Sequence, residues 1–135
     1  MENEIWSALR KHLDSVFKND SKTYAKTTGE DLSLYEWWET PHRQDGLDVH
    51  LFCIENAWAG KGGKWRYDFL EPKLQIYGNT AIVCYTLMIT RVEKTGITRK
   101  VHNESRVLVK QSGQWKVVHV HKSPAWRAPY MEPAE

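Results

Sequence analysis

The chain has 135 residues, of which 41% are apolar, and its formal charge is +2 with the histidines counted as neutral. This length is typical of one domain, spanning residues 1–135, that buries a single core without disulfide or metal support. Acidic and basic residues are interspersed, so the sequence lacks the basic patch of a nucleic-acid-binding protein and we expect no DNA or RNA partner.

The first segment is not typical of a signal peptide, because it carries Glu2 and Glu4 and leads into an amphipathic stretch. No apolar run approaches the length of a membrane span, so no membrane partner is expected. Cys53 and Cys84 lie in apolar runs without metal-type spacing, as is usual for buried thiols in a reducing compartment. We therefore expect a cytoplasmic protein without a cofactor.

The chain begins with a predicted helix. Apolar residues recur at three- and four-residue steps over 4–17, the period of a helix with one buried stripe. Asp20 or Ser21 is suited to cap a short second helix that ends before Gly29. Residues 32–38 then read as a strand, and a further helix is expected over 46–58.

The second half of the chain is predicted to be a strand meander. Four strands are expected at 65–77, 80–92, 98–110 and 115–122. Turns at 78–79, 94–96 and 111–113 join them. Residues 124–135 contain three prolines and are expected to form a C-terminal tail. Helices followed by a meander predict an α+β domain in which a curved sheet wraps over helices.

Five blocks of sequence resemble one known family, and they occur in its order over roughly residues 4–125. They are Asp-Leu-Ser-Leu-Tyr-Glu at 31–36, Gly-Leu-Asp-Val-His with Glu-Asn at 46–56, Leu-Glu-Pro at 70–72, Glu-Ser-Arg-Val at 104–107, and Gly-Gln-Trp with His-Val-His at 113–121. They resemble the association (hub) domain of calcium/calmodulin-dependent protein kinase II, within the NTF2-like superfamily. The resemblance implies a cone in which N-terminal helices pack on a strongly curved, mostly antiparallel sheet.

The resemblance also implies self-association, because the kinase hub domain pairs through its sheet and stacks into closed rings. We expect a homodimer or a ring of dimers without catalytic activity of its own. A kinase domain is a partner only by resemblance, and the chain is either an excised hub domain or a stand-alone homologue. The interface residues expected on the exposed face of the terminal sheet are Trp115, Val117, His119, Val107 and Val109.

An internal basic and aromatic pocket is implied as well, with a small carboxylate as its ligand. The expected ligand-binding residues are Arg106, Lys122, Tyr85, Glu36 and Arg66. A three-residue turn at 111–113 places Arg106, Glu104 and Lys122 on one face of the sheet, and we prefer it; a two-residue turn places Arg106 beside His119. Leu87 stands where the kinase hub has another pocket arginine, and Arg66 stands where it has a histidine.

Two alternatives remain open for this pocket. A buried Arg106 needs a counter-charge, which Glu36 or Glu104 supplies internally if no ligand does, and Glu36 is the partner that we prefer. The same cone also serves SnoaL-like and ketosteroid-isomerase-like enzymes, whose general base would here be Glu36, although a nearby Arg106 lowers its basicity. His119 and His121 share one strand face, but no further metal ligand is recognisable beside them. The remaining histidines are expected at the surface: His12, His42, His50 and His102.

Overall fold

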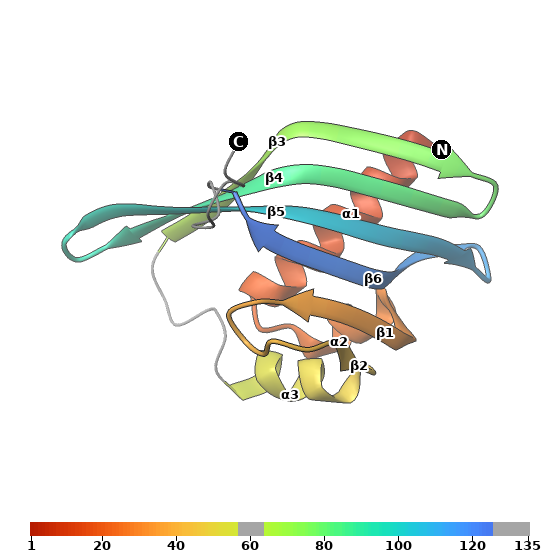
Figure 1. Cartoon of the computed structure of the whole chain (residues 1–135), viewed down its shortest axis with the longest axis horizontal. Coiled ribbons are helices and arrows are strands. Elements are labelled where there is room, and N and C mark those ends of the chain that lie inside the picture. The colour runs from red at the N-terminus through yellow and green to blue at the C-terminus, as the bar shows by residue number, and fades with distance from the viewer. Residues whose placement is uncertain (57–63, 126–135) are drawn as a thin grey trace, which may run out of the picture.

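The structure is a computed structural model that describes residues 1–56 and 64–125 (Figure 1). Three helices and six strands follow one another along the chain. They are α1 (Glu2–Phe17), α2 (Ser21–Lys26), β1 (Thr28–Glu36), β2 (Gln44–Asp45), α3 (Asp48–Asn56), β3 (Lys64–Tyr77), β4 (Thr80–Glu93), β5 (Gly96–Gln111) and β6 (Gln114–Pro124). The predicted helices and strands are therefore present, and the two-residue strand β2 is an addition to them.

The six strands form one curled sheet in the order β2-β1-β6-β5-β4-β3. Strands β3 to β6 are an antiparallel meander, while β1 lies parallel to β6. Helix α1 crosses one face of the meander, and α2 and α3 lie beside β1 (Figure 1). The predicted α+β cone, with N-terminal helices on a strongly curved and mostly antiparallel sheet, is confirmed.

The core lies between α1 and the inner face of the sheet. Helix α1 contributes Ile5, Leu9 and Leu13, which recur at helical spacing and are almost completely buried. The side chains that they meet come from four strands: Leu32, Leu34, Ala81, Val83, Tyr85, Leu87, Leu108, Trp115, Val117 and Val120. Asp20 caps α2 by accepting a hydrogen bond from the Thr23 backbone N–H at 3.1 Å, as the sequence predicted.

The turn between β5 and β6 has two residues, not the three that we preferred. Gln111 pairs with Gln114, and the turn residues Ser112 and Gly113 have φ angles of 51° and 78°. Two consecutive positive φ angles are the geometry of the tight hairpin turns that match the twist of the strands, and glycine adopts such angles without strain.

A β-bulge at Val118 then changes the register within β6. Leu108 pairs with Val117, but Val107 pairs with His119, so Val118 is an extra residue on this strand. Arg106 consequently pairs with Val120 and not with His119, although the turn has two residues. Gly29 makes room for the bulge, because a Cβ built on it would lie 2.9 Å from Val118 Cγ1.

The bulge also corrects the expected faces of β6. Trp115 and Val117 were predicted on the exposed face, but their side chains are 5% and 1% exposed and belong to the core. The prediction assumed an unbroken alternation from residue 115 to residue 121. Because Val118 is inserted, Trp115 and Val117 point inward before the bulge, and Val120 and Lys122 point inward after it.

A second bulge interrupts β3, which is an edge strand of the sheet. The pairing of β3 with β4 shifts between Leu70 and Lys73, and Glu71 has a φ of 49°. The end of the third predicted helix at Trp58 lies outside the described residues, and so does most of the predicted C-terminal tail. None of the helices in the described parts of the chain is long and apolar enough to cross a membrane.

Candidate functional site

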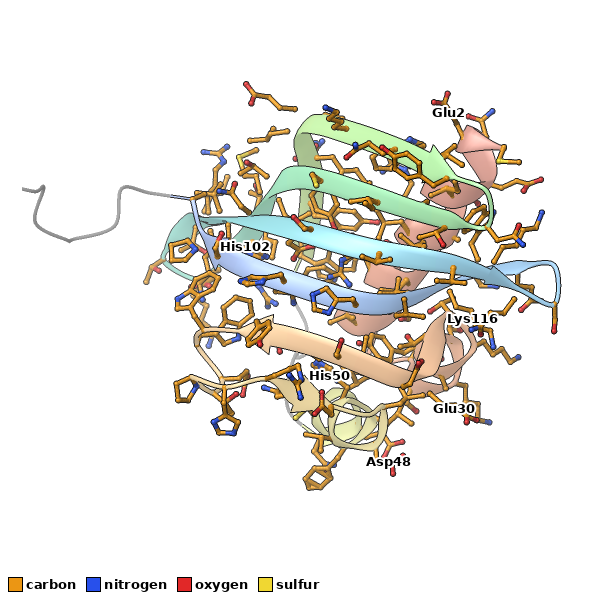
Figure 2. The ribbon with its side chains drawn as sticks, turned by 45° about the vertical axis from the view of Figure 1, so that its right-hand side comes forward. Glu2, Glu30, Asp48, His50, His102 and Lys116 are labelled. Atoms are coloured by element: carbon orange, nitrogen blue, oxygen red, sulfur yellow. The ribbon has the colours of Figure 1, made fainter. Side chains whose placement is uncertain are left out.

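A cavity of about 200 Å³ lies between the helices and the inner face of the sheet. His12 reaches it from α1, Glu36 from the end of β1, and His50 from α3. His50 of α3 and His102 of β5, both labelled in Figure 2, belong to the wall of this cavity. The other charged side chains that line it come from neighbouring strands or the loop after β1: Glu39, Arg91, Glu104, Arg106 and Lys122.

Arg106 and Glu104 form a buried ion pair in this cavity. Arg106 Nε donates to Glu104 Oε1 at 3.1 Å and to the Tyr85 hydroxyl at 3.0 Å. The Tyr85 hydroxyl in turn donates to Glu104 Oε1 at 2.5 Å. The structure thus brings Arg106 and Tyr85 together as predicted, but the partner of Arg106 is Glu104. Our choice of Glu36 as that partner is wrong, because β5 places Glu104 two residues before Arg106 on the same face.

Glu36 is paired with Lys122 instead. Lys122 Nζ donates to Glu36 Oε2 at 2.6 Å and lies 4.0 Å from Glu104 Oε2. The four charged groups therefore form a chain from Arg106 through Glu104 and Lys122 to Glu36, with negative and positive charges alternating. Trp38 covers the Lys122 end, with its ring centroid 5.1 Å from the Nζ atom.

Burial and neighbouring charges set the protonation of these groups. Burial alone would raise the pKa of Glu104, but Arg106 and the hydrogen bond from His102 Nε2 at 2.5 Å hold that pKa well below its usual value. Burial raises the pKa of the Tyr85 hydroxyl well above its usual value, so it remains a neutral donor to Glu104. Burial by itself would lower the pKa of Arg106. The negative charge of Glu104 outweighs this effect, so the pKa of Arg106 is raised.

Three of the four histidines that we expected at the surface are buried. His12 is 0% exposed, and His50 and His102 are nearly as buried, while His42 is exposed as predicted. Burial, followed by the charges of Arg106 and Lys122, holds the pKa of His12 well below its usual value. Burial also lowers the pKa of His50, to about 4. Both rings are therefore neutral at physiological pH.

The environment of His12 also fixes its tautomer. His12 Nδ1 lies 2.9 Å from Thr27 Oγ1 and 3.2 Å from Thr28 Oγ1. Both hydroxyls donate to backbone carbonyl oxygens at the end of α2. Since each hydroxyl has one proton, Nδ1 must be the donor to them, and Nε2 is left as an acceptor. Nε2 is buried and has no hydrogen-bond partner among the described residues.

Arg66 does not belong to this cavity. It pairs with Thr90 on the outer face of the sheet, its side chain is 72% exposed, and it forms an ion pair with Asp68 at 2.6 Å. The expectation rested on its alignment with a pocket histidine of the hub family. The side chains of Trp65 and Tyr67 occupy the inward positions on either side of Arg66, stacked with Phe17.

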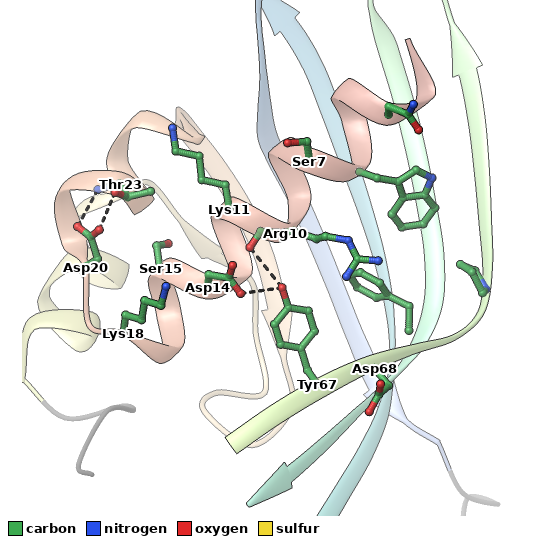
Figure 3. Close-up of a pocket in the computed structure, with 14 residues that line it drawn as sticks. Ser7, Arg10, Lys11, Asp14, Ser15, Lys18, Asp20, Thr23, Tyr67 and Asp68 are labelled. Atoms are coloured by element: carbon green, nitrogen blue, oxygen red, sulfur yellow. Dashed lines mark hydrogen bonds between the residues drawn. The ribbon is translucent and has the colours of Figure 1, made fainter. Parts of the chain in front are cut away.

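A larger hollow of about 1010 Å³ lies along the outer side of α1 against β3, and Figure 3 shows the residues around it. Its main polar groups bind one another: Tyr67 donates to Asp14 Oδ1 at 2.8 Å, and Asp20 accepts from Thr23. The Arg10 guanidinium lies over the Phe69 ring at 4.8 Å. We regard the smaller cavity as the candidate ligand site, because the polar groups of its wall converge.

The outer face of the meander carries the remaining interface residues. Val107 pairs with Ile82 on one side and with His119 on the other, and Val109 lies two residues further along β5. All four are partly exposed. Among the described elements, no helix covers this face (Figure 1). His119 Nδ1 is 2.8 Å from Ser33 Oγ of β1, and burial lowers its pKa.

Cavity residues that were not predicted there include His12, His50, His102 and Trp38. Signals for three of them were present. His12 lies on the buried stripe of α1, His50 lies four residues before the buried Ile54, and His102 alternates with Glu104 and Arg106 along β5. Trp38 lies beyond the end of β1, where the pattern gave no indication of its direction.

The fold described above is that of the NTF2-like proteins. An NTF2-like superfamily protein from Salmonella enterica superposes with a TM-score of 0.74 and 22% identity, over 94% of this chain and 93% of that one.

Sequence similarity places the chain in one particular family with this fold. The family model of the calcium/calmodulin dependent protein kinase II association domain matches residues 1–126, and the chain belongs to this family. The association domain of the C. elegans kinase superposes with a TM-score of 0.80 and 25% identity, over 90% of this chain and 94% of that one. The delta subunit of the kinase from Oryctolagus cuniculus is 23% identical over 134 residues, which are 98% of this chain and 25% of that protein. The chain thus spans about a quarter of the length of this curated relative.

Proposed function

We propose that the protein is a self-associating scaffold of the hub type that assembles through the outer face of its sheet, in the cytoplasm. The observation that supports this most directly is the half-buried apolar row of Ile82 and Val107, with Val109 beside it, on a face that none of the described helices covers. Membership of the association-domain family supports the same assignment.

Trp115 and Val117 are removed from this interface, because they are in the core of the single chain. Val107, Val109 and His119 remain as its proposed centre. The face is mixed in character, since Ser105 and His121 form the next cross-strand row beside Val107 and His119. An interface with apolar side chains at the centre and polar ones around them is usual for stable homo-oligomers.

Measurement of the mass in solution tests the scaffold. We expect light scattering to give a dimer or a ring of dimers at tens of micromolar for the wild type. Val107→Lys buries a charge in the proposed interface and should reduce the mass to that of a monomer while the circular dichroism spectrum is unchanged. Val92→Lys, at an exposed position near the β4–β5 turn, is the matched control and should leave the mass unchanged. A monomeric wild type contradicts the proposal.

We further propose that the cavity binds a small carboxylate. The support is the position of Arg106 and Lys122 on its wall, where the side chain of Arg106 is 4% exposed and that of Lys122 is 14% exposed. The cavity of about 200 Å³ is below the roughly 300–1,000 Å³ of a drug-sized site, so the ligand has only a few heavy atoms. Calorimetry with acetate, propionate and butyrate measures the affinity of the cavity for small carboxylates. If no small carboxylate binds, simple or substituted, the proposal of a carboxylate site is wrong.

The enzyme alternative has less support. Glu36, its candidate general base, accepts a hydrogen bond from Lys122 at 2.6 Å and serves as the counter-charge of that cation. A base held in this way loses the ion pair when it takes up a proton, which makes proton abstraction unfavourable. We therefore propose a non-catalytic role for the chain.

A further inference from the structure

We infer that the cavity selects a small amino carboxylate, a ligand with both an ammonium and a carboxylate group, over a simple carboxylate of the same length. This inference rests on the proposed ligand site and specifies the chemistry that the site recognises. It follows from three features of the cavity: the balance of its charges, the order of those charges, and the hydrogen-bonding atoms that are left unused.

The charges on the cavity wall balance. Arg106 and Lys122 supply two positive charges, and Glu104 and Glu36 supply two negative ones, joined by contacts of 3.1 Å and 2.6 Å. Arg91 and Glu39 add one charge of each sign to the wall. A ligand with a net negative charge therefore gains little from the field of the four groups taken together, but pays the full cost of losing its own hydration. A ligand with no net charge but two opposite ends avoids this penalty.

The order of the charges gives the cavity a direction. Glu104 and Lys122 lie in the middle of the chain, 4.0 Å apart. Arg106 is the positive end, and Glu36 is the negative end. A dipolar ligand that lies along this chain with its carboxylate toward Arg106 and its ammonium toward Glu36 is attracted at both ends.

The unused hydrogen-bonding atoms have the matching chemistry. Both hydrogen bonds that Arg106 makes to described residues leave from Nε, so its two Nη groups are donors without a partner among those residues. Glu36 Oε1 is a buried acceptor that makes no hydrogen bond to a described residue, and its contact with His50 Nε2 is 3.6 Å long. His12 Nε2 is a second such acceptor. A buried polar atom without a partner is costly, so a ligand that donates to the acceptors and accepts from Arg106 is favoured.

A simple carboxylate satisfies only part of this set. It accepts from the Arg106 Nη groups, but it offers no proton to Glu36 Oε1 or His12 Nε2. An ammonium group carries three protons and donates to both acceptors. The amino carboxylate is consequently the smallest ligand class that engages the donors and the acceptors of the cavity at the same time.

The experiment compares matched ligand pairs on the full chain at pH 8 by isothermal titration calorimetry. The pairs are glycine with acetate, β-alanine with propionate, and 4-aminobutanoate with butyrate, so that each differs by the amino group and the three lengths sample the separation of the charges. We expect at least one amino carboxylate to bind tenfold or more tightly than its partner. Equal or tighter binding of the simple carboxylates overturns this inference but leaves the proposed carboxylate site intact. Failure of all six to bind overturns both.

The variant Glu36→Gln tests whether the preference for amino carboxylates depends on Glu36. It removes the negative end while keeping the shape, and it leaves the wall with a net positive charge, so simple carboxylates should bind several-fold more tightly and the preference for the amino partner should disappear. Glu93→Gln removes a carboxylate at the exposed end of β4 and should change neither series. A preference that survives Glu36→Gln contradicts the assignment to Glu36. If this variant does not fold, the six ligands on the wild type still decide the inference.

Discussion

At the scale of single residues, the cavity depends on charges that are satisfied inside the protein. Arg106, Glu104 and Glu36 are each 3% exposed or less, yet each has an oppositely charged partner. Breaking a buried pair is far more costly than breaking an exposed one, because the remaining charge stays in a medium of low polarity. The stability cost of a substitution therefore reports where a charge lies.

Arg106→Ala should destabilise the protein strongly. It leaves Glu104 buried without its main counter-charge, and the loss of one member of a buried pair costs about 3–5 kcal/mol. Arg66→Ala removes the exposed partner of Asp68 and should leave the stability unchanged within error. Urea denaturation of the two variants and the wild type measures the change in the free energy of unfolding for each substitution. Equal losses of stability would mean that Arg106 is not in a buried pair.

The buried histidines predict a loss of stability at mildly acidic pH. Their pKa values are lower in the folded protein than the 6.5 or so of an unfolded chain, to about 4 for His50 and in the same direction for His12. The unfolded state therefore binds more protons, and stability is constant above about pH 6.5 and falls toward pH 4. Each histidine contributes about 1.4 kcal/mol per pH unit in this window.

Urea denaturation at half-unit steps from pH 7.5 to pH 5 checks this dependence. His50→Gln should reduce the slope, because one of the groups whose pKa is lowered in the folded state is removed. His42→Gln, at an exposed position, should leave the slope unchanged. A stability that does not vary between pH 7 and pH 5 would show that these rings are not buried in the neutral form.

At the scale of secondary-structure elements, the β-bulge of β6 decides which side chains reach the cavity. Val118 is the inserted residue, and Gly29 of β1 lies against it. A Cβ at Gly29 would be 2.9 Å from Val118 Cγ1, which is closer than ordinary contacts allow. The start of β1 and the bulge are therefore packed together and should be energetically coupled.

Gly29→Ala should cost about 1–3 kcal/mol through overpacking against the bulge. Val118→Ala removes the methyl group that is in the way, so the double variant should recover at least half of that loss. A double-mutant cycle by thermal denaturation measures the coupling. Additive effects of the two substitutions would mean that the bulge does not lie against β1.

The bulge also marks where prediction from sequence stops. Local periodicity was sufficient for α1 and for the four long strands, because a helix stripe and an apolar alternation are properties of consecutive residues. The positions of Arg106 and Lys122 in the cavity came from family resemblance. The inward direction of Trp115 depends on strand register, which one inserted residue reverses. The pairing of Glu104 with Arg106 instead follows from the alternation of side chains along β5, so the sequence contained the information for it. The burial of His12 was visible in its helical position, but it was outweighed by the usual surface preference of histidine.

At the scale of the whole molecule, self-association links stability to concentration. If folded chains associate and unfolded ones do not, the melting temperature rises with protein concentration. The core does not behave in this way, because its contacts are made within one chain. The two groups of residues that we first assigned to one interface can therefore be separated by a single type of measurement.

Melting curves from about 1 to 100 µM should show a rising melting temperature for the wild type. Val107→Lys should abolish this dependence. Trp115→Ala should lower stability by about 3–5 kcal/mol, through loss of a large core side chain, while the dependence remains. A concentration-independent wild type, or a Trp115→Ala protein that melts normally, would contradict this division between interface and core.

The bulge in β3 bears on the direction in which such an assembly can grow. An exposed edge strand of 14 residues is a template for adding the strand of another chain, and repeated addition produces open-ended fibres. Here the edge is interrupted in its middle, where Glu71 adopts a positive φ and Pro72 has no N–H to offer. The opposite edge is β2, which has two residues. Within the described residues, neither border of the sheet offers a long unbroken edge for strand addition, which favours contact through the faces of the sheet and hence assemblies of finite size.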